Sequence, residues 1–211
     1  GFDKNDINDL LNIAASGSFP GSILAGKVHE IDFISDYAAF LVKTIREGVN
    51  DPEGYEQPLG GLKIIVDAGN GAGGFFVHKV LVPLGADISG SQFLEPDGHF
   101  PNHIPNPEDQ EAMASISDAV RYARADLGII FDTDVDRAAI VDASGEPVNR
   151  NKLIALISAI ILEEHPGSVI VTDSITSTGL TRFIEEELGG THHRFKRGYK
   201  NVINESIRLK E

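Results

Sequence analysis

The sequence predicts an α/β fold built of layered α/β/α domains with a mixed sheet, one domain complete and a second one partial. Two observations lead to this prediction. From residue 36 onward, short apolar runs typical of buried strands alternate with longer segments of helical periodicity. The alternation restarts near residue 150 but includes only two strands, which are too few for a complete sheet.

The first 30 residues contain a short predicted helix over 7–15 and then a connector rich in glycine, serine and proline. We interpret residues 1–30 as the tail of a preceding domain with its linker. Apolar residues then recur at helical spacing over 36–48, which predicts an amphipathic helix. This helix opens the domain that we assign to residues 31–149.

Within that domain, apolar runs predict the strands, and the segments between them predict the helices. Asn106 is expected to cap the helix that follows it, with Pro107 in the first turn. The expected strands are 62–68, 86–92 and 125–131, the expected helices are 71–85 and the segment after Asn106, and residues 138–148 are typical of a hairpin around Ser144 and Gly145.

Residues 150–211 are assigned to the amino-terminal part of a further α/β domain. The helix expected over 151–165 is apolar on nearly all sides, so we expect it to be well buried. A strand over 168–174, a helix over 176–189, a strand over 191–198 and a helix from 201 complete the prediction.

The bulk composition narrows the classes of function. The formal net charge of −14 argues against nucleic acid and anionic membrane as partners. There is no cysteine and no apolar run long enough to span a bilayer, so we expect a cytoplasmic protein. The charge fits a cation site or a small-molecule substrate that is bound together with a metal.

Three aspartates follow the apolar run at 127–131 at alternate positions: Asp132, Asp134 and Asp136. In extended chain these side chains share one face, and carboxylates about 4 Å apart repel by roughly 4 kcal/mol per pair. The neighbouring Arg137 offsets only part of this charge. Because oxygen ligands favour Mg²⁺, Mn²⁺ or Ca²⁺, the triplet predicts a divalent cation site, against the alternative of a solvated acidic turn.

Two other kinds of aspartate loop share part of this pattern. An EF-hand requires glycine and glutamate where this sequence has Arg137 and Ala143, so the loop is not an EF-hand. A phosphatase with a D-x-D nucleophile, here Asp132, remains an alternative function.

Gly69, Gly71 and Gly74 match the spacing of a dinucleotide fingerprint, with Glu95 further on. A dinucleotide-binding module therefore remains a second alternative. We favour a tight turn in which glycine permits close packing. A third alternative is a regulatory or structural protein that keeps the fold of an enzyme but has lost its chemistry. The three intact aspartates argue against this alternative.

Together, the stretches VDAGNGAGG, EPDGHFPNHIPNPED, ADLGIIFDTDVDR, SITST and FKRGYKNV resemble the α-D-phosphohexomutase family, which includes phosphoglucomutase and phosphomannomutase. The resemblance covers the chain from about residue 31. It implies a central piece of a four-domain enzyme, with the second domain complete and the third one begun.

The resemblance also implies roles for individual residues. Asp132, Asp134 and Asp136 would bind Mg²⁺ together with a phosphoserine from another domain, and Arg137 would orient the loop and the phosphate. Lys196 matches a lysine that approaches the reacting group, and Gly198 and Tyr199 lie in the same substrate-facing loop. The family usually has glycine or alanine where this chain has Thr133 and Val135.

The family's net reaction converts hexose 1-phosphate to hexose 6-phosphate through a sugar bisphosphate. The phosphorylated hexose and the other domains of the same polypeptide are therefore the expected partners. Because the serine loop, the sugar-selecting loop and the fourth-domain phosphate loop are not in this sequence, we expect the chain alone to be inactive.

Overall fold

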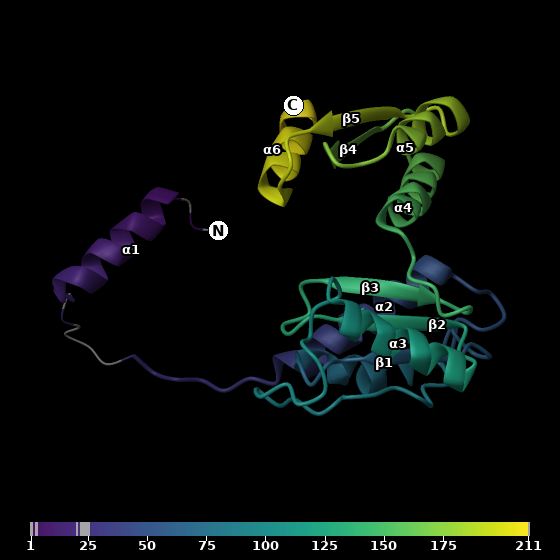
Figure 1. Cartoon of the computed structure of the whole chain (residues 1–211), viewed down its shortest axis with the longest axis horizontal. Helices are drawn as coiled ribbons and strands as arrows, with labels where there is room; N and C mark the ends of the chain where they lie inside the picture. The colour runs from purple at the N-terminus through teal and green to yellow at the C-terminus, as the bar shows by residue number, and fades with distance from the viewer. Residues whose placement is uncertain (1, 3, 20, 22–25, 211) are drawn as a thin grey trace. The chain divides into compact units, whose positions relative to one another are not determined.

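The computed structural model of the chain describes residues 2, 4–19, 21 and 26–210 (Figure 1). Its internal contacts divide it into two units, residues 1–33 and residues 34–211. The first unit contains the expected helix as α1 (Lys4–Ser16). Part of the expected linker lies outside the described residues. None of the helices in the described part is long and apolar enough to cross a membrane.

The second unit contains a three-stranded mixed sheet of β1 (Ile64–Asp67), β2 (Leu127–Phe131) and β3 (Ala138–Asp142). β1 runs parallel to β2, and β2 runs antiparallel to β3. The short return from β2 to β3 holds the three aspartates. The mixed sheet that the sequence predicts is confirmed.

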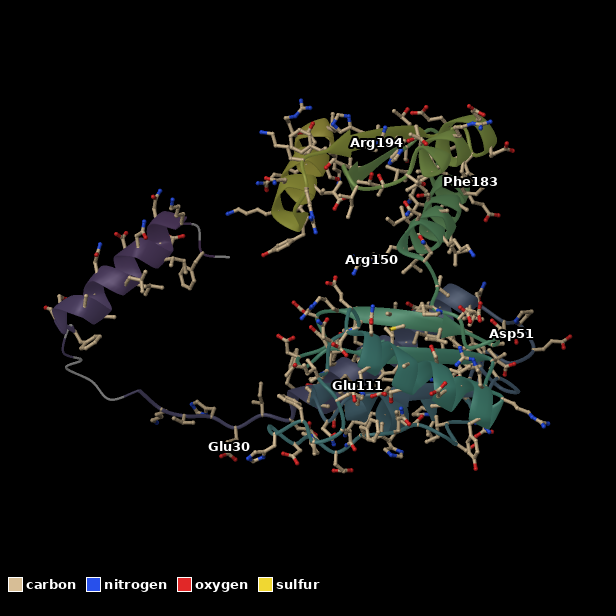
Figure 2. All side chains as sticks on the ribbon, in the orientation of Figure 1. Glu30, Asp51, Glu111, Arg150, Phe183 and Arg194 are labelled. Carbon is tan, nitrogen blue, oxygen red and sulfur yellow. The ribbon has the colours of Figure 1, made fainter. Side chains whose placement is uncertain are left out.

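Helix α3 (Gln110–Ala123) covers one face of this sheet (Figure 1). Figure 2 shows its side chains, with Glu111 marking the first turn. The close approach depends on Gly128, because a Cβ there would lie 2.5 Å from Cγ2 of Val120. The buried core of this layer consists of Ile65, Ala112, Ile116, Val120, Ala125, Ile130 and Val141.

The other face packs against the segment that runs from η1 (Ala72–Gly74) through η2 (Val77–Leu81). Helix α2 (Phe33–Val49) covers this segment in turn. The sequence predicts one regular helix over 71–85. The structure instead opens it as a 3₁₀ turn and widens it to a π turn, with the Val82 N–H donating to Val77 O at 3.0 Å. Pro83 has no N–H, which favours ending the helix there.

The strand expected over 86–92 is wrong as a continuous element. The segment touches β1 at its two ends, where Asp87 bridges Lys63 and Gln92 bridges Asp67. Between them the chain turns at Gly90, whose φ is +109°. The Ser91 hydroxyl accepts a hydrogen bond from the Val66 N–H at 3.0 Å. This side chain takes the place of the backbone carbonyl that a regular neighbouring strand would offer.

The expected cap of α3 is also wrong. Asp109, and not Asn106, is the N-cap, because its Oδ1 accepts the N–H of Glu111 at 2.9 Å and of Ala112 at 3.1 Å. Asn106 lies one turn earlier, where its Oδ1 accepts the Glu108 N–H at 3.1 Å. The sequence thus predicts a capping residue at the end of the loop that leads into α3, but places it three positions too early.

Residues 150–210 form a two-stranded parallel sheet with helices around it. The strands are β4 (Val169–Asp173) and β5 (Thr191–Phe195), and the helices are α4 (Arg150–Glu164), α5 (Thr178–Arg182), η3 (Phe183–Glu187) and α6 (Tyr199–Lys210). The expected burial of α4 is wrong: Leu156, Ile157 and Ile160 are 50–59% exposed. Only the face that carries Ser158 and Leu162 is buried, with Leu162 in a small core with Leu180 and Ile184.

Glu205 ties α6 to β5. It is only 6% exposed, it accepts two hydrogen bonds from the Arg208 guanidinium at 2.9 and 2.7 Å, and His193 Nε2 lies 3.0 Å from it. Mainly because of Arg208, and against the effect of burial, its pKa falls from 4.5 to about 2. A pKa that is lower in the folded state stabilises the fold at neutral pH.

We therefore expect Glu205→Gln to lower the denaturation midpoint at neutral pH. Because the stabilisation disappears as the pH falls through the folded pKa, the gap between wild type and variant should close between about 4.5 and about 2. Urea denaturation across this pH range measures it, with the exposed Glu186→Gln as control. A gap that stays constant with pH would contradict the assignment.

Candidate metal centre

Three loops meet where the parallel strands β1 and β2 end. The glycine turn (residues 68–74) follows β1, the aspartate loop (residues 132–137) follows β2, and the asparagine loop (residues 95–109) leads into α3. Because the carboxyl ends of parallel strands share one edge of a sheet, their loops are natural builders of a common site.

The aspartate loop brings the predicted metal ligands together. Asp132, Asp134 and Asp136 each offer a carboxylate oxygen, and these atoms lie within 4.8 Å of one another. Asp132 is buried at the base of the loop, whereas Asp134 and Asp136 are exposed. Three oxygen donors with one open side fit a hard divalent cation such as Mg²⁺, which commonly keeps further positions for water or phosphate oxygens.

Arg137 closes the loop on itself. Its backbone N–H donates to Asp132 Oδ1 at 3.1 Å, and its Nε lies 2.9 Å from Asp132 Oδ2 and 3.3 Å from Asp136 Oδ1. The Asp132 N–H donates back to the Arg137 carbonyl at 3.1 Å. The guanidinium is thus fixed between two of the three carboxylates.

One guanidinium faces three carboxylates, so negative charge remains in surplus in the loop. Burial by itself raises the pKa of Asp132, but the hydrogen bonds from the Arg137 backbone and from Asp136, together with the guanidinium, hold it below 3.8. The pKa of Asp136 is raised, first by the hydrogen bond it shares with Asp132, then by burial and by the charges of Asp132 and Asp134. A bound cation would relieve this repulsion.

Val135 lies between two of the ligands in a backbone conformation that its side chain disfavours. Its φ is +66°, in the left-handed region that β-branched residues rarely adopt. Its side chain packs into the core beside Phe131 and lines a cavity of about 300 Å³ with Phe75 and Phe76. Val135 therefore adds an apolar anchor to the loop and introduces backbone strain there.

This strain predicts that Val135→Gly is more stable than Val135→Ala by about 1 kcal/mol, the reverse of their usual order. Both variants lose the two γ-methyl groups of valine and differ only by the β-carbon, so the comparison reports chiefly on the backbone. Chemical denaturation of the two variants provides the measurement. An alanine variant as stable as the glycine variant would show that φ at this position is not strained.

The glycine turn supports the aspartate loop from one side. The Ala72 N–H donates to Thr133 O at 2.9 Å, and a Cβ at Gly71 would lie 2.8 Å from the same oxygen. Gly73 meets the ring of Phe131, where a Cβ would approach to 2.7 Å. These glycines make room for another part of the chain, whereas in a dinucleotide site they make room for a pyrophosphate. The structure favours the tight-turn interpretation.

The remaining predicted residues lie at the turn between β5 and α6. Lys196, Gly198 and Tyr199 are all exposed, and Tyr199 is 82% exposed. The Lys196 ammonium lies 6.0 Å from the centroid of the Phe195 ring, and Gly198 has a φ of +115° that permits the turn. The ammonium and the phenol are therefore accessible to a ligand.

Comparison with known proteins separates the open alternatives. Residues 41–145, which contain all three loops, match the family described as phosphoglucomutase/phosphomannomutase, alpha/beta/alpha domain II. A phosphomannomutase of Salmonella montevideo is 32% identical over 214 residues, covering 97% of this chain and 44% of the relative. The chain belongs to the α-D-phosphohexomutase family. The phosphatase and dinucleotide alternatives are not favoured.

Two further proteins of the family support this assignment. A phosphomannomutase/phosphoglucomutase of Pseudomonas syringae is 36% identical over 144 residues, which is 68% of this chain and 30% of that protein. A phosphoglucomutase/phosphomannomutase family structure from Burkholderia thailandensis matches 99% of the chain with a TM-score of 0.79 and 25% identity, and the match covers 42% of its own chain. The chain thus spans less than half the length of these relatives.

Proposed function

We propose that this chain supplies the Mg²⁺-binding part of a phosphohexomutase that interconverts hexose 1-phosphate and hexose 6-phosphate through a phosphoserine and a sugar bisphosphate. The observation that carries the proposal is the convergence of three aspartate oxygens within 4.8 Å, in a loop braced by Arg137 and by the glycine turn. Family membership and the names of the relatives support the reaction class.

Each residue has a defined part in this proposal. Asp132, Asp134 and Asp136 would hold Mg²⁺, which supplies positive charge to the oxygens of a phosphoryl group in transfer. Arg137 keeps Asp132 and Asp136 in place while part of its guanidinium stays exposed toward solvent. Lys196 offers a cation to the phosphorylated hexose, and Gly198 and Tyr199 shape the same loop.

The phosphoserine and the sugar-selecting residues belong, in this proposal, to the rest of a longer polypeptide. The domain limits 1–30, 31–149 and 150–211 are part of it, as is a cytoplasmic location, which a chain without cysteine supports. The proposal implies that residues 1–211 alone bind the metal but do not turn over substrate.

Coupled assays of glucose 1-phosphate and mannose 1-phosphate conversion test this function. The polypeptide that contains this chain together with the remaining family domains is supplied with Mg²⁺ and a bisphosphate primer. We expect a 6-phosphate product from at least one sugar, and none from the 211-residue chain alone. Absence of product from both sugars would overturn a glucose or mannose mutase.

A further inference from the structure

The carboxylate of Asp67, the last residue of β1, is completely buried and joins four segments of the chain. Its oxygens accept the Gly69 N–H at 2.9 Å, the Gln92 amide at 2.8 Å and the Ser115 hydroxyl at 3.0 Å. His103 Nε2 lies 3.0 Å from both oxygens, and its side chain is only 2% exposed. Because carboxylate oxygens only accept, Nε2 is the donor.

The His103 ring fixes the asparagine loop over the glycine turn. Its second nitrogen, Nδ1, lies 3.0 Å from the Ile104 carbonyl, so both ring nitrogens face oxygen acceptors. A Cβ at Gly69 would lie 2.8 Å from Pro105 Cβ and 3.1 Å from the His103 ring. With so little space, the position of His103 sets the position of the residues that follow it.

Two paths lead from this pair to the aspartate loop. On one side the asparagine loop continues to Asn106, whose Oδ1 lies 3.3 Å from Arg137 Nη1. Arg137 is the residue that clamps Asp132 and Asp136. On the other side the glycine turn, anchored through the Gly69 N–H, holds Thr133 O by way of Ala72.

We propose that the buried Asp67–His103 pair positions the metal-binding loop, acting through Asn106 on Arg137, so that the three aspartates are arranged before a cation arrives. The inference rests on the proposed function, since it takes the aspartate loop as the metal site. His103 and Asn106 are positioning residues that touch neither the ion nor its ligands. Groups that hold metal ligands directly, as Arg137 does in this loop, typically change metal affinity by 10- to 100-fold.

Binding of Mn²⁺ to the 211-residue chain, followed by the electron paramagnetic resonance signal of the free ion, tests the proposal without any assay of activity. Mn²⁺ accepts the same oxygen ligands as Mg²⁺. We expect His103→Leu and Asn106→Ala each to weaken binding by about tenfold. His103→Gln keeps a nitrogen donor toward Asp67 and should restore affinity to within about twofold of wild type.

His99→Leu is the matched control, because His99 lies on the same loop but its side chain is 95% exposed. It should leave Mn²⁺ binding unchanged. The double variant of His103→Leu and Asn106→Ala should bind about as weakly as the weaker single variant, since both act along one path. If the double variant instead loses Mn²⁺ affinity by the product of the two single losses, the two residues act independently, and the shared path is overturned.

The outcomes separate the two proposals. If wild type does not bind Mn²⁺, the metal function fails, and the positioning role fails with it. If wild type binds Mn²⁺ and both single variants bind equally well, the metal function stands and the positioning role is overturned. Asn106→Ala, a change at a partly exposed loop residue, decides the question if His103→Leu does not fold.

Discussion

Replacing Asp134 with asparagine is expected to weaken Mn²⁺ binding to the chain by at least about 100-fold and, under the proposed function, to remove mutase activity from a polypeptide that contains all the family domains. Asp134 is exposed, and its oxygen lies within 4.8 Å of those of Asp132 and Asp136. The change replaces a charged ligand with a neutral one at an exposed position, so the fold should remain. Mn²⁺ titration of the variant measures the loss of metal binding, and urea denaturation of the same variant shows whether the fold remains stable.

Asp118→Asn is the control for this experiment. Asp118 is an aspartate of α3 whose side chain is 78% exposed and pairs with Arg121. Its loss should leave Mn²⁺ affinity as in wild type, because an exposed ion pair contributes little beyond its own position. Unchanged Mn²⁺ affinity in Asp134→Asn would remove this residue from the ligand set.

The second large effect is expected from Gly74→Ala, which should lower the free energy of unfolding by about 3 kcal/mol or more. A Cβ at Gly74 would overlap the carbonyl of Leu94. The glycine turn and the segment around Leu94 cannot easily move apart, because two hydrogen bonds join them. The Asn70 N–H donates to Phe93 O at 2.8 Å, and the Asn70 side chain donates to Glu95 O at 2.9 Å. Denaturant titration measures the loss.

Gly48→Ala provides the opposite result in the same assay. Gly48 lies in α2, and a Cβ there would meet nothing within 4 Å. Alanine should therefore stabilise the helix by about 0.5–1 kcal/mol. Equal effects at the two glycines would mean that the contact between Gly74 and Leu94 does not constrain the fold.

Strands β1 and β2 could be predicted from the sequence because burial leaves a continuous apolar run, as at 127–131. The predictions that were wrong concern features for which neighbouring residues or faces are equally suited by sequence. Asn106 and Asp109 both carry capping side chains, and only the structure shows that Asn106 is engaged elsewhere. Likewise α4 is apolar all round, and the pattern could not say which face packs.

The site shows the same division. The aspartates are close together in sequence, so their mutual repulsion can be read directly and predicts a cation. Asp67 and His103 are 36 positions apart, and no pattern in the sequence joins them. An acidic residue that ends a fully buried strand requires a donor, and this was the available signal.

The interrupted segment at 86–92 also has a consequence for how the protein behaves among its copies. It covers the outer edge of β1, and residues 146–148 cover the outer edge of β3, where the Val148 N–H donates to Ile140 O at 2.8 Å and Pro147 bridges Val141. Neither cover continues as a regular strand, because one contains a turn and the other a proline without an N–H. The three-stranded sheet is therefore protected on both sides against growth by strand addition, which disfavours edge-to-edge aggregation.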